Sequence, residues 1–361
     1  MHQEIEGLVP SPSRRSVVRA RRFAVSLGSF EEVFSLENLV ASALVCRCGV
    51  SWKREVQSFH LNLLGNCVKL RDELLNGTYR LTRGKRFRIN ERGKPRDIVT
   101  CAFRDRVVQR TLCDRVLVPA VERVIIYDNG ACIPGRGTSF ALARLERHLR
   151  GHARHHGTDG ALFLFDFAKY FESIRLDMVM NAFGRIVFDA RLLALLRQTL
   201  EVGSRGLGLG NQTSQVAAVL YPNAIDHWAK DEMRVAGYGR YMDDGYALFG
   251  DWDEARDFAR GFGSRCAALG LSLNPRKTRL LHPGEEFTFL KTRFLLCANG
   301  EVRKRLPAET YRRRHRHVMG MERLARAGVL GPDDLAASEA SWRSVLLRLG
   351  AGCGGKLHGT C

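Results

Sequence analysis

The sequence has no long apolar run. No stretch reaches the roughly 18 consecutive apolar residues of a membrane-spanning helix, and the polar N-terminus lacks the apolar segment of a signal peptide. No lipidation signal and no basic amphipathic anchor stands out. We therefore expect a cytoplasmic protein that does not use a membrane.

The 10 cysteines show no metal-site spacing. Cys46 and Cys48 stand too close together and have no matching second pair, so the sequence predicts no zinc site. Four histidines gather around a predicted loop, again without an acidic or cysteine partner at metal-site spacing: His148, His152, His155 and His156. We interpret the cysteines as reduced thiols of a cytosolic protein and the histidines as an exposed loop that faces nucleic acid or solvent.

Acidic residues are few for the number of basic ones. The 361 residues include 38 Asp and Glu against 57 Lys and Arg, which gives a net charge of +19. A hydrophobic content of 45% indicates a globular protein, and the length suits two or three subdomains. The basic excess predicts a polyanionic partner, with nucleic acid as the first candidate and an anionic membrane surface as the rival.

Two adjacent aspartates, Asp243 and Asp244, lie between apolar residues in the glycine-bracketed segment 237–250. This pattern predicts a β-hairpin with both carboxylates at its tight turn. Adjacent carboxylates repel each other, and a divalent cation such as Mg²⁺ or Mn²⁺ relieves that repulsion while gaining the oxygen ligands it prefers. The alternative is a solvated Asp-Asp turn on a surface hairpin.

The apolar run 161–171 carries a single carboxylate, Asp166, and has the pattern of a buried strand. A carboxylate at such a position costs desolvation free energy unless it is paired or bound to metal. The alternative role is a cap on the helix that follows. Three carboxylates on two adjoining strands would hold the two metal ions that promote in-line displacement at a phosphate.

Taken together, the Tyr-Met-Asp-Asp segment 241–244, the upstream Asp166 and the intervening segment 210–215 resemble the palm motifs of a reverse transcriptase. The form Leu-Gly-x-x-x-Ser-Gln at 209–215 is similar to the reverse transcriptases of diversity-generating retroelements. The resemblance runs from about residue 61 to about residue 294. The glycine-rich stretch 203–210 lacks the Gly-Lys-Ser/Thr of a P-loop, so a nucleotide-binding P-loop is not predicted.

The resemblance implies an α+β, right-hand polymerase fold with fingers, a palm of antiparallel sheet with helices behind it, and a short helical thumb. The expected divisions are a basic, disordered arm at 1–30, N-terminal helices and fingers at 31–160, the palm at 161–300, the thumb at 301–350 and a disordered tail at 351–361. Apolar spacing predicts helices at 30–44, 56–75, 103–117, 141–149, 177–200, 213–228 and 252–269. The helix at 177–200 is expected to break near 184–189. The helix at 213–228 is expected to start with a cap from Thr213 or Ser214 and to be interrupted at Pro222. A strand pair is expected at 287–294.

The resemblance also assigns catalytic roles. Asp166, Asp243 and Asp244 would bind two Mg²⁺ ions, with Mn²⁺ as the alternative metal, and the backbone carbonyl of Phe167 would add a further ligand. Lys277 would protonate the leaving pyrophosphate as a general acid, or would simply neutralise phosphate.

Substrate contacts follow from the same resemblance. Three cations of a predicted two-stranded ribbon would hold the incoming triphosphate, unless the ribbon is only a soluble basic hairpin: Lys85, Lys94 and Arg96. Phe171 would exclude a 2′-hydroxyl and thereby select deoxynucleotides, unless it is a core residue. Four residues would lie against the nascent base pair: Leu209, Gly210, Ser214 and Gln215. Because Leu209 cannot make the polar contact of a glutamine, we expect looser selection and error-prone copying.

The partners implied are an RNA template and primer, deoxynucleoside triphosphates and a small basic accessory protein. Asp105, inside an Arg-Asp-Arg segment, is interpreted as an ion-pair partner of those arginines and not as a metal ligand. Two rival interpretations are a group II intron-like or defence-associated reverse transcriptase, and a catalytically silent RNA-binding protein on the same fold.

Overall fold

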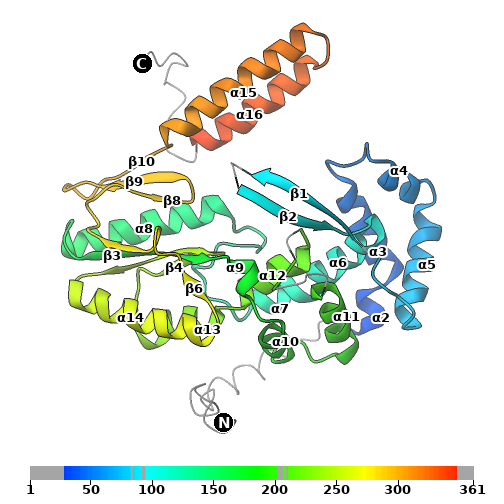
Figure 1. Ribbon diagram of the computed structural model, residues 1–361, viewed down its shortest axis with the longest axis horizontal. Coiled ribbons are helices and arrows are strands. Elements are labelled where there is room, and N and C mark those ends of the chain that lie inside the picture. The colour runs from blue at the N-terminus through cyan, green and yellow to red at the C-terminus, as the bar shows by residue number, and fades with distance from the viewer. Residues whose placement is uncertain (1–27, 83, 92–93, 202–205, 209, 348–361) are drawn as a thin grey trace. The chain divides into compact units, whose positions relative to one another are not determined.

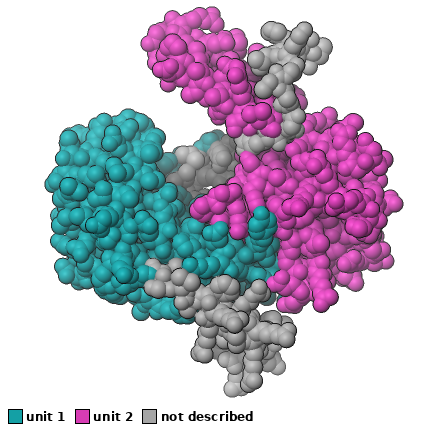
Figure 2. Space-filling view, turned by 180° about the vertical axis from the view of Figure 1, so that it is seen from behind, with its two compact units in different colours: residues 1–127, 167–228, 263–272 teal, residues 128–166, 229–262, 273–361 magenta. Residues whose placement is uncertain are grey.

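The computed structural model describes residues 28–82, 84–91, 94–201, 206–208 and 210–347, without the side chains of 85, 86, 89, 91 and 94–99. The predictions for the N-terminal arm, the C-terminal tail and Leu209 therefore lie outside the described residues. The chain forms two compact units, each built from three separate stretches (Figure 2). Unit 1 contains residues 1–127, 167–228 and 263–272, and unit 2 contains residues 128–166, 229–262 and 273–361.

Unit 1 begins with four helices: α2 (Phe30–Val33), α3 (Leu36–Arg47), α4 (Arg54–Leu61) and α5 (Leu63–Leu75). The sequence predicts helices in these two regions, but each predicted helix is interrupted once. The first break comes at Ser35, whose hydroxyl accepts a hydrogen bond from the Asn38 N–H and so starts a new helix. The second comes at Asn62, which has a non-helical backbone between α4 and α5.

The next part of unit 1 is a ribbon of two antiparallel strands, β1 (Lys85–Glu91) and β2 (Lys94–Thr100). It is followed by α6 (Phe103–Leu112), the π-helical turn η1 (Cys113–Leu117) and α7 (Val118–Glu122). The predicted basic ribbon and the helix that follows it are thus confirmed as secondary structure.

The rest of unit 1 is helical: α9 (Tyr170–Ser173), α10 (Leu176–Gly184), α11 (Ala190–Leu200), α12 (Gln212–Leu220) and α13 (Asn223–His227). The predicted breaks near 184–189 and at Pro222 are confirmed. Asp189 caps α11 by accepting hydrogen bonds from two backbone N–H groups. The predicted cap by Thr213 or Ser214 is wrong, because both lie inside α12 and Asn211 occupies the N-cap position.

Unit 2 is organised around an antiparallel sheet in which β3 (Ala161–Ala168) pairs with both β5 (Asp244–Phe249) and β7 (Arg279–Leu281). The hairpin partner of β5 is β4 (Gly239–Tyr241), and the strand order is β4-β5-β3-β6, with β6 at Ser272–Leu273. A smaller sheet has the order β10-β9-β8, from β8 (Phe287–Phe289), β9 (Thr292–Leu296) and β10 (Val302–Arg305). The predicted strand pair at 287–294 is confirmed.

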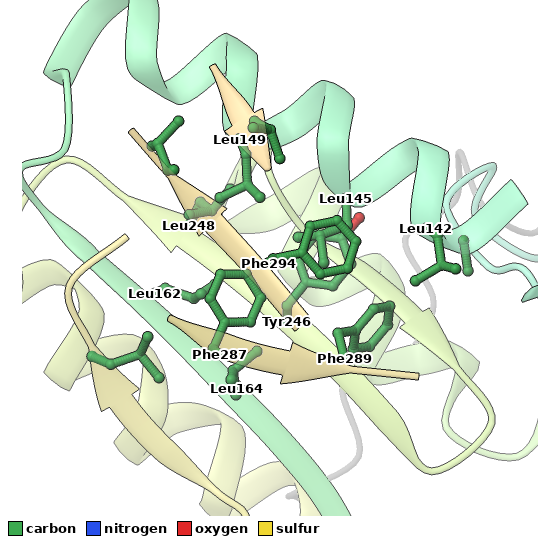
Figure 3. Packing of buried hydrophobic residues seen from close by; sticks show 14 residues of the cluster. Leu142, Leu145, Leu149, Leu162, Leu164, Tyr246, Leu248, Phe287, Phe289 and Phe294 are labelled. Atoms are coloured by element: carbon green, nitrogen blue, oxygen red, sulfur yellow. The ribbon is translucent and has the colours of Figure 1, made fainter. Parts of the chain in front are cut away.

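Both faces of β3 are covered, which explains its unbroken apolar sequence. Successive side chains of a strand point to opposite faces. On one face, Leu162 and Leu164 join leucines of α8 (Thr138–His156) and aromatic rings of β8 and β9 in one buried cluster (Figure 3). On the other face, Phe163 and Phe165 pack against rings of α14 (Trp252–Ala268), among them Phe262.

The remaining helices of unit 2 are the π-helical turn η2 (Trp228–Glu232) and the pair α15 (Ala308–Arg326) and α16 (Pro332–Leu347). The last two pack against each other (Figure 1), with Tyr311 and Trp342 in edge-to-face contact at 5.8 Å. Neither helix has a buried residue. No helix in the described part of the chain has the length and apolarity needed to cross a membrane.

Candidate active site

Asp166 and Asp244 lie directly opposite each other on neighbouring strands. They form the last pair of the ladder between β3 and β5, and Asp244 is the first residue of β5. Asp166 is buried, with 3% of its surface exposed, and Asp243 and Asp244 are half-buried. The fold thus brings together carboxylates that are 77 or more positions apart in sequence.

The turn between β4 and β5 is tight, as the sequence predicts. Tyr241 pairs with Asp244, so that Met242 and Asp243 form the turn, and Met242 adopts a left-handed backbone with φ of 55°. The Arg240 guanidinium, only 1% exposed, donates a hydrogen bond of 2.9 Å to the Met242 carbonyl. A buried cation therefore fixes the strained residue that precedes the two aspartates.

Gly245 follows the aspartates and allows the sheet to close around them. A Cβ atom at this position would lie 2.1 Å from the ring of Phe165 on β3. No side chain fits in that space, so the close approach of the two strands depends on glycine.

A turn at residues 274–278 also contacts Asp166. The Asn274 side chain donates to Asp166 Oδ1 at 2.9 Å, and the Asn274 backbone N–H donates to the Asp166 carbonyl at 2.7 Å. Lys277 Nζ forms an ion pair with Asp166 Oδ2. Both carboxylate oxygens of Asp166 therefore have a named partner.

The electrostatics of the site favour a cation. Burial, the neighbouring charge of Asp243 and a hydrogen bond with Asp166 together raise the pKa of Asp244 to about 7. Burial alone would lower the pKa of Lys277, but its hydrogen bond to Asp166 and the aspartate charges raise it above its ordinary value. The site holds more negative charge than Lys277 neutralises, and Lys277 stays protonated at neutral pH.

The donor set suits a hard divalent ion, because carboxylate oxygens are the ligands that Mg²⁺ and Mn²⁺ prefer. In the described residues, no group of three or more His, Cys, Asp and Glu is already arranged as a metal site. Lys277 and Asn274 occupy the Asp166 oxygens instead. The carboxylates of Asp166, Asp243 and Asp244 are therefore suitable metal ligands, and Asp166 is paired with Lys277.

A buried ion cluster supports the hairpin from behind. Asp128, 7% exposed, pairs with Arg144 and, at 2.7 Å, with Lys230. Burial alone would raise the pKa of Asp128, but the hydrogen bonds from Arg144 and Lys230 hold it below its ordinary value. The Asp128 carbonyl accepts from the Arg240 N–H at 3.2 Å, which links the cluster to β4.

The prediction of an exposed histidine loop is wrong, because the four residues are helical and two of them do not face solvent. All four histidines lie in α8, and the side chains of His148 and His152 are turned inward, because residues four apart share one face of a helix. His148 Nδ1 lies 3.0 Å from the Tyr246 hydroxyl. Burial lowers the pKa of His148 to about 4, although the charge of Asp128 opposes the shift. His155 and His156 are exposed, as expected.

In unit 1, the predicted gate residue Phe171 is half-buried and packs edge-to-face on Tyr170 at 5.8 Å. Its carbonyl accepts a hydrogen bond of 2.8 Å from the Leu207 N–H. A Cβ atom on Gly206, whose φ is 62°, would lie 2.2 Å from that carbonyl. The glycine-rich loop is therefore built against the backbone of Phe171.

The other predicted substrate residues are also in unit 1. Gly210 and Gln215 line one cavity, whereas the Ser214 side chain is fully buried in α12. Lys85, Lys94 and Arg96 stand on the ribbon, where only the backbone is described. Asp105 is 3.8 Å from Arg104 Nε and accepts from the Tyr79 hydroxyl at 2.7 Å, so the ion-pair interpretation is confirmed for Arg104.

Comparison with known proteins decides the family. The model of the family described as reverse transcriptase (RNA-dependent DNA polymerase) matches residues 85–294, more than half of the chain. The chain belongs to the reverse transcriptase family. Its helices and antiparallel sheets agree with the palm-and-fingers fold of that family. Reverse transcriptases act on nucleic acid templates and nucleotides and generally use divalent metal ions.

Among curated proteins, the chain is similar to Protein YkfC of Escherichia coli (strain K12). The two are 29% identical over 147 residues, which cover 40% of this chain and 38% of YkfC. The match thus spans well under half of that relative.

Several residues that shape the site were not predicted from the sequence: Arg240, Asn274 and the cluster around Asp128. The Asn-Pro pair at 274–275 is a turn signal that could have indicated the turn itself. Its contact with Asp166, across 108 positions, depends on the pairing of β3 and β7 and has no local signature.

Proposed function

We propose that the chain copies RNA into DNA at the carboxylates of unit 2, and that it is the error-prone reverse transcriptase of a diversity-generating retroelement. The paired register of Asp166 and Asp244 is the observation that carries the polymerase site. The Leu-Gly-x-x-x-Ser-Gln segment at 209–215 supports the retroelement type.

Asp166, Asp243 and Asp244 would hold two divalent ions, Mg²⁺ first and Mn²⁺ as the alternative, with the Phe167 carbonyl as a further ligand. When bound, these ions make the primer 3′-hydroxyl a better nucleophile and stabilise charge at the α-phosphate. Neighbouring residues position the carboxylates. Arg240 fixes the turn before Asp243, and Asn274 orients Asp166.

Lys277 would supply the proton that the leaving group needs. Its ammonium group is the general acid that protonates the leaving pyrophosphate. The raised pKa of Lys277 keeps the proton in place at neutral pH. Lys277 would thus have two roles, the ion pair with Asp166 and proton donation to the leaving pyrophosphate.

Nucleotide selection is assigned to unit 1. Phe171 would exclude the 2′-hydroxyl, and its support from Gly206 and Leu207 resists displacement of the backbone. Leu209, Gly210, Ser214 and Gln215 would lie against the nascent base pair, and Lys85, Lys94 and Arg96 would hold the triphosphate. A small basic accessory protein is the expected partner.

Primer extension on RNA followed by sequencing of the product tests the retroelement assignment. Errors concentrated opposite template adenines would support it. Accurate copying would keep the polymerase but favour an intron-like or defence-associated enzyme. Restoring a polar side chain with Leu209→Gln should lower the error frequency, whereas Leu330→Gln, in the turn between α15 and α16, is the matched control.

A further inference from the structure

The buried side chain of Tyr246 connects the catalytic hairpin to α8. Tyr246 follows Asp244 by two positions on β5, so both side chains lie on the same face of the sheet. Its ring is 1% exposed, lies in the apolar cluster of Figure 3 and contacts Phe289 edge-to-face at 5.3 Å. Its hydroxyl lies against β4, because a Cβ atom on Gly239, the residue paired with Tyr246, would be 2.6 Å from that oxygen. The ring thus carries a polar atom to the interface between β4 and α8.

His148 of α8 is the partner of this hydroxyl. Its Nδ1 lies 3.0 Å from the Tyr246 oxygen, and its Nε2 lies 3.3 Å from a terminal nitrogen of Arg144. The guanidinium can only donate, so Nε2 accepts and carries no proton. Because burial lowers the pKa of His148 to about 4, the ring is neutral at pH 7 and its single N–H is at Nδ1. Nδ1 therefore donates to the Tyr246 hydroxyl.

The same cluster holds the other strand of the hairpin. Asp128 accepts from Arg144 Nε through its carboxylate and, at 3.2 Å, from the Arg240 N–H through its carbonyl. The Gly130 N–H donates in turn to the Arg240 carbonyl at 3.1 Å. Residues 128–130 thus hold β4, while the hydrogen bond from His148 holds β5. One buried cluster therefore contacts both strands of the catalytic hairpin.

The hydroxyl of Tyr246 is not needed to fill the core. A phenylalanine ring would occupy the same space and would bury no polar group that has to be hydrogen-bonded. The hydroxyl and its donor add a fixed distance between β5 and α8, two residues from Asp244. Such a constraint matters for carboxylates that bind Mg²⁺, because this ion requires near-ideal octahedral geometry.

We propose that His148 is a positioning residue for the catalytic carboxylates and that it acts through Tyr246. The Nδ1–H bond sets the position of β5 relative to β4, and thereby the position of Asp244 opposite Asp166. The proposal rests on the RNA-copying function proposed above. Loss of the bond should impair metal binding and leave the contacts with nucleotide unchanged.

Metal binding is measured on the full chain without nucleic acid or nucleotide, by titration with Mn²⁺ followed through the electron paramagnetic resonance signal of the free ion. Primer extension on RNA gives the Mg²⁺ concentration for half-maximal rate, kcat, and KM for the deoxynucleotide. The variants are Tyr246→Phe, His148→Leu and their combination. The conservative variant is His148→Asn, whose amide nitrogen is bonded to Cγ as Nδ1 is and can donate in its place. The controls are His155→Leu, at an exposed position of the same helix, and Tyr311→Phe, at a residue that is 45% exposed.

We expect Tyr246→Phe and His148→Leu each to weaken Mn²⁺ binding about tenfold and to raise the Mg²⁺ requirement to a similar extent, as does the loss of other groups that orient metal ligands. KM should not change, because the nucleotide contacts are intact. The combined variant should be no weaker than either single variant, since both substitutions break the same bond. His148→Asn and the two controls should resemble the wild type.

Unchanged Mn²⁺ affinity and Mg²⁺ requirement in Tyr246→Phe and His148→Leu would overturn the proposal. This holds even if both variants melt at a lower temperature, because the bond would then contribute to stability alone. Additive losses in the combined variant, or a His148→Asn variant as weak as His148→Leu, would also overturn it. If His148→Leu does not fold, Tyr246→Phe, which keeps the ring, decides the outcome.

The two readouts separate this inference from the proposed function. A protein that extends primers without any of these effects overturns only the positioning role. A wild type that extends no primer overturns the proposed function, and the Mn²⁺ titrations then still decide the positioning role.

Discussion

Asn274 is joined to Asp166 twice, by its backbone N–H at 2.7 Å to the carbonyl and by its side chain at 2.9 Å to the carboxylate. The first bond sets the position of the turn against β3, and the second orients the carboxylate. Because only the second involves the side chain, substitution separates them.

Asn274→Ala should therefore leave the fold intact and weaken the use of metal. Hydrogen bonds to charged groups contribute about 1.5–3 kcal/mol, so we expect the Mg²⁺ concentration for half-maximal extension to rise about tenfold or more. A magnesium titration of primer extension measures this. Asn299→Ala, an exposed asparagine of unit 2, is the control. An unchanged magnesium requirement would contradict the positioning role.

Lys277→Met should lower kcat by about 10²–10⁴-fold, the usual contribution of a general acid, with little change in KM for the deoxynucleotide. Single-nucleotide extension under steady-state conditions measures both constants. Arg276→Met, the adjacent cation of the same turn, should be near wild type. If Lys277 only neutralised phosphate, KM would rise instead and Lys277→Arg would restore full activity.

Phe171→Ala should relax sugar selection. Removal of a ring that clashes with the 2′-hydroxyl should raise ribonucleotide use relative to deoxynucleotide use by about tenfold or more, equivalent to about 1.4 kcal/mol. The ratio of kcat/KM for the two substrates is the measurement. Phe188→Ala, which removes a ring that is 66% exposed, is the matched control. An unchanged ratio would make Phe171 a core residue, the alternative interpretation.

Arg240→Met keeps much of the volume of the side chain but removes the donor to the Met242 carbonyl. We expect a loss of about 1.5–3 kcal/mol in the free energy of unfolding, measured with urea, together with loss of extension activity. Arg312→Met, at an exposed position of α15, should change neither. Full activity in Arg240→Met would show that the turn holds its shape without the buried cation.

The buried His148 predicts a pH dependence of stability. Its pKa falls from about 6.5 in the unfolded chain to about 4 in the folded protein, so the unfolded state binds the proton more tightly. Stability is fully present above pH 6.5 and falls as the pH drops toward 4, by about 2 kcal/mol between pH 6.5 and 5. His148→Gln should flatten this part of the curve, and His155→Gln, at an exposed site, should not. Equal pH slopes in all three proteins would contradict the assignment.

The sequence predicts local elements of this protein well and its long-range contacts poorly. The hairpin around Asp243, the buried strand at Asp166 and the break at Pro222 follow from turn residues, apolar runs and the missing proline N–H. The inward orientation of the His148 side chain was missed. A histidine on a basic helix is expected to face solvent, and the sequence does not show that Asp128 is its partner. The cavity that Gly210 and Gln215 line was missed for the same reason, since the residues of its walls are distant in sequence.

The resemblance to reverse transcriptases contributed an expectation that periodicity does not supply, namely that Asp166, Asp243 and Asp244 would form one site. The register of β3 against β5 gives the physical basis for that pairing. The roles of Lys85, Lys94 and Arg96 stay predictions, as do the domain boundaries at 161 and 301.

The most direct test is primer extension on an RNA template with Mg²⁺, comparing the wild type with Asp243→Ala/Asp244→Ala. The control is Asp253→Ala/Asp257→Ala, which removes two exposed carboxylates from α14. We predict extension by the wild type and the control, and none by the Asp243/Asp244 variant, with RNA binding retained in all three. Extension that survives in the Asp243/Asp244 variant would contradict the assignment of the catalytic site to these carboxylates.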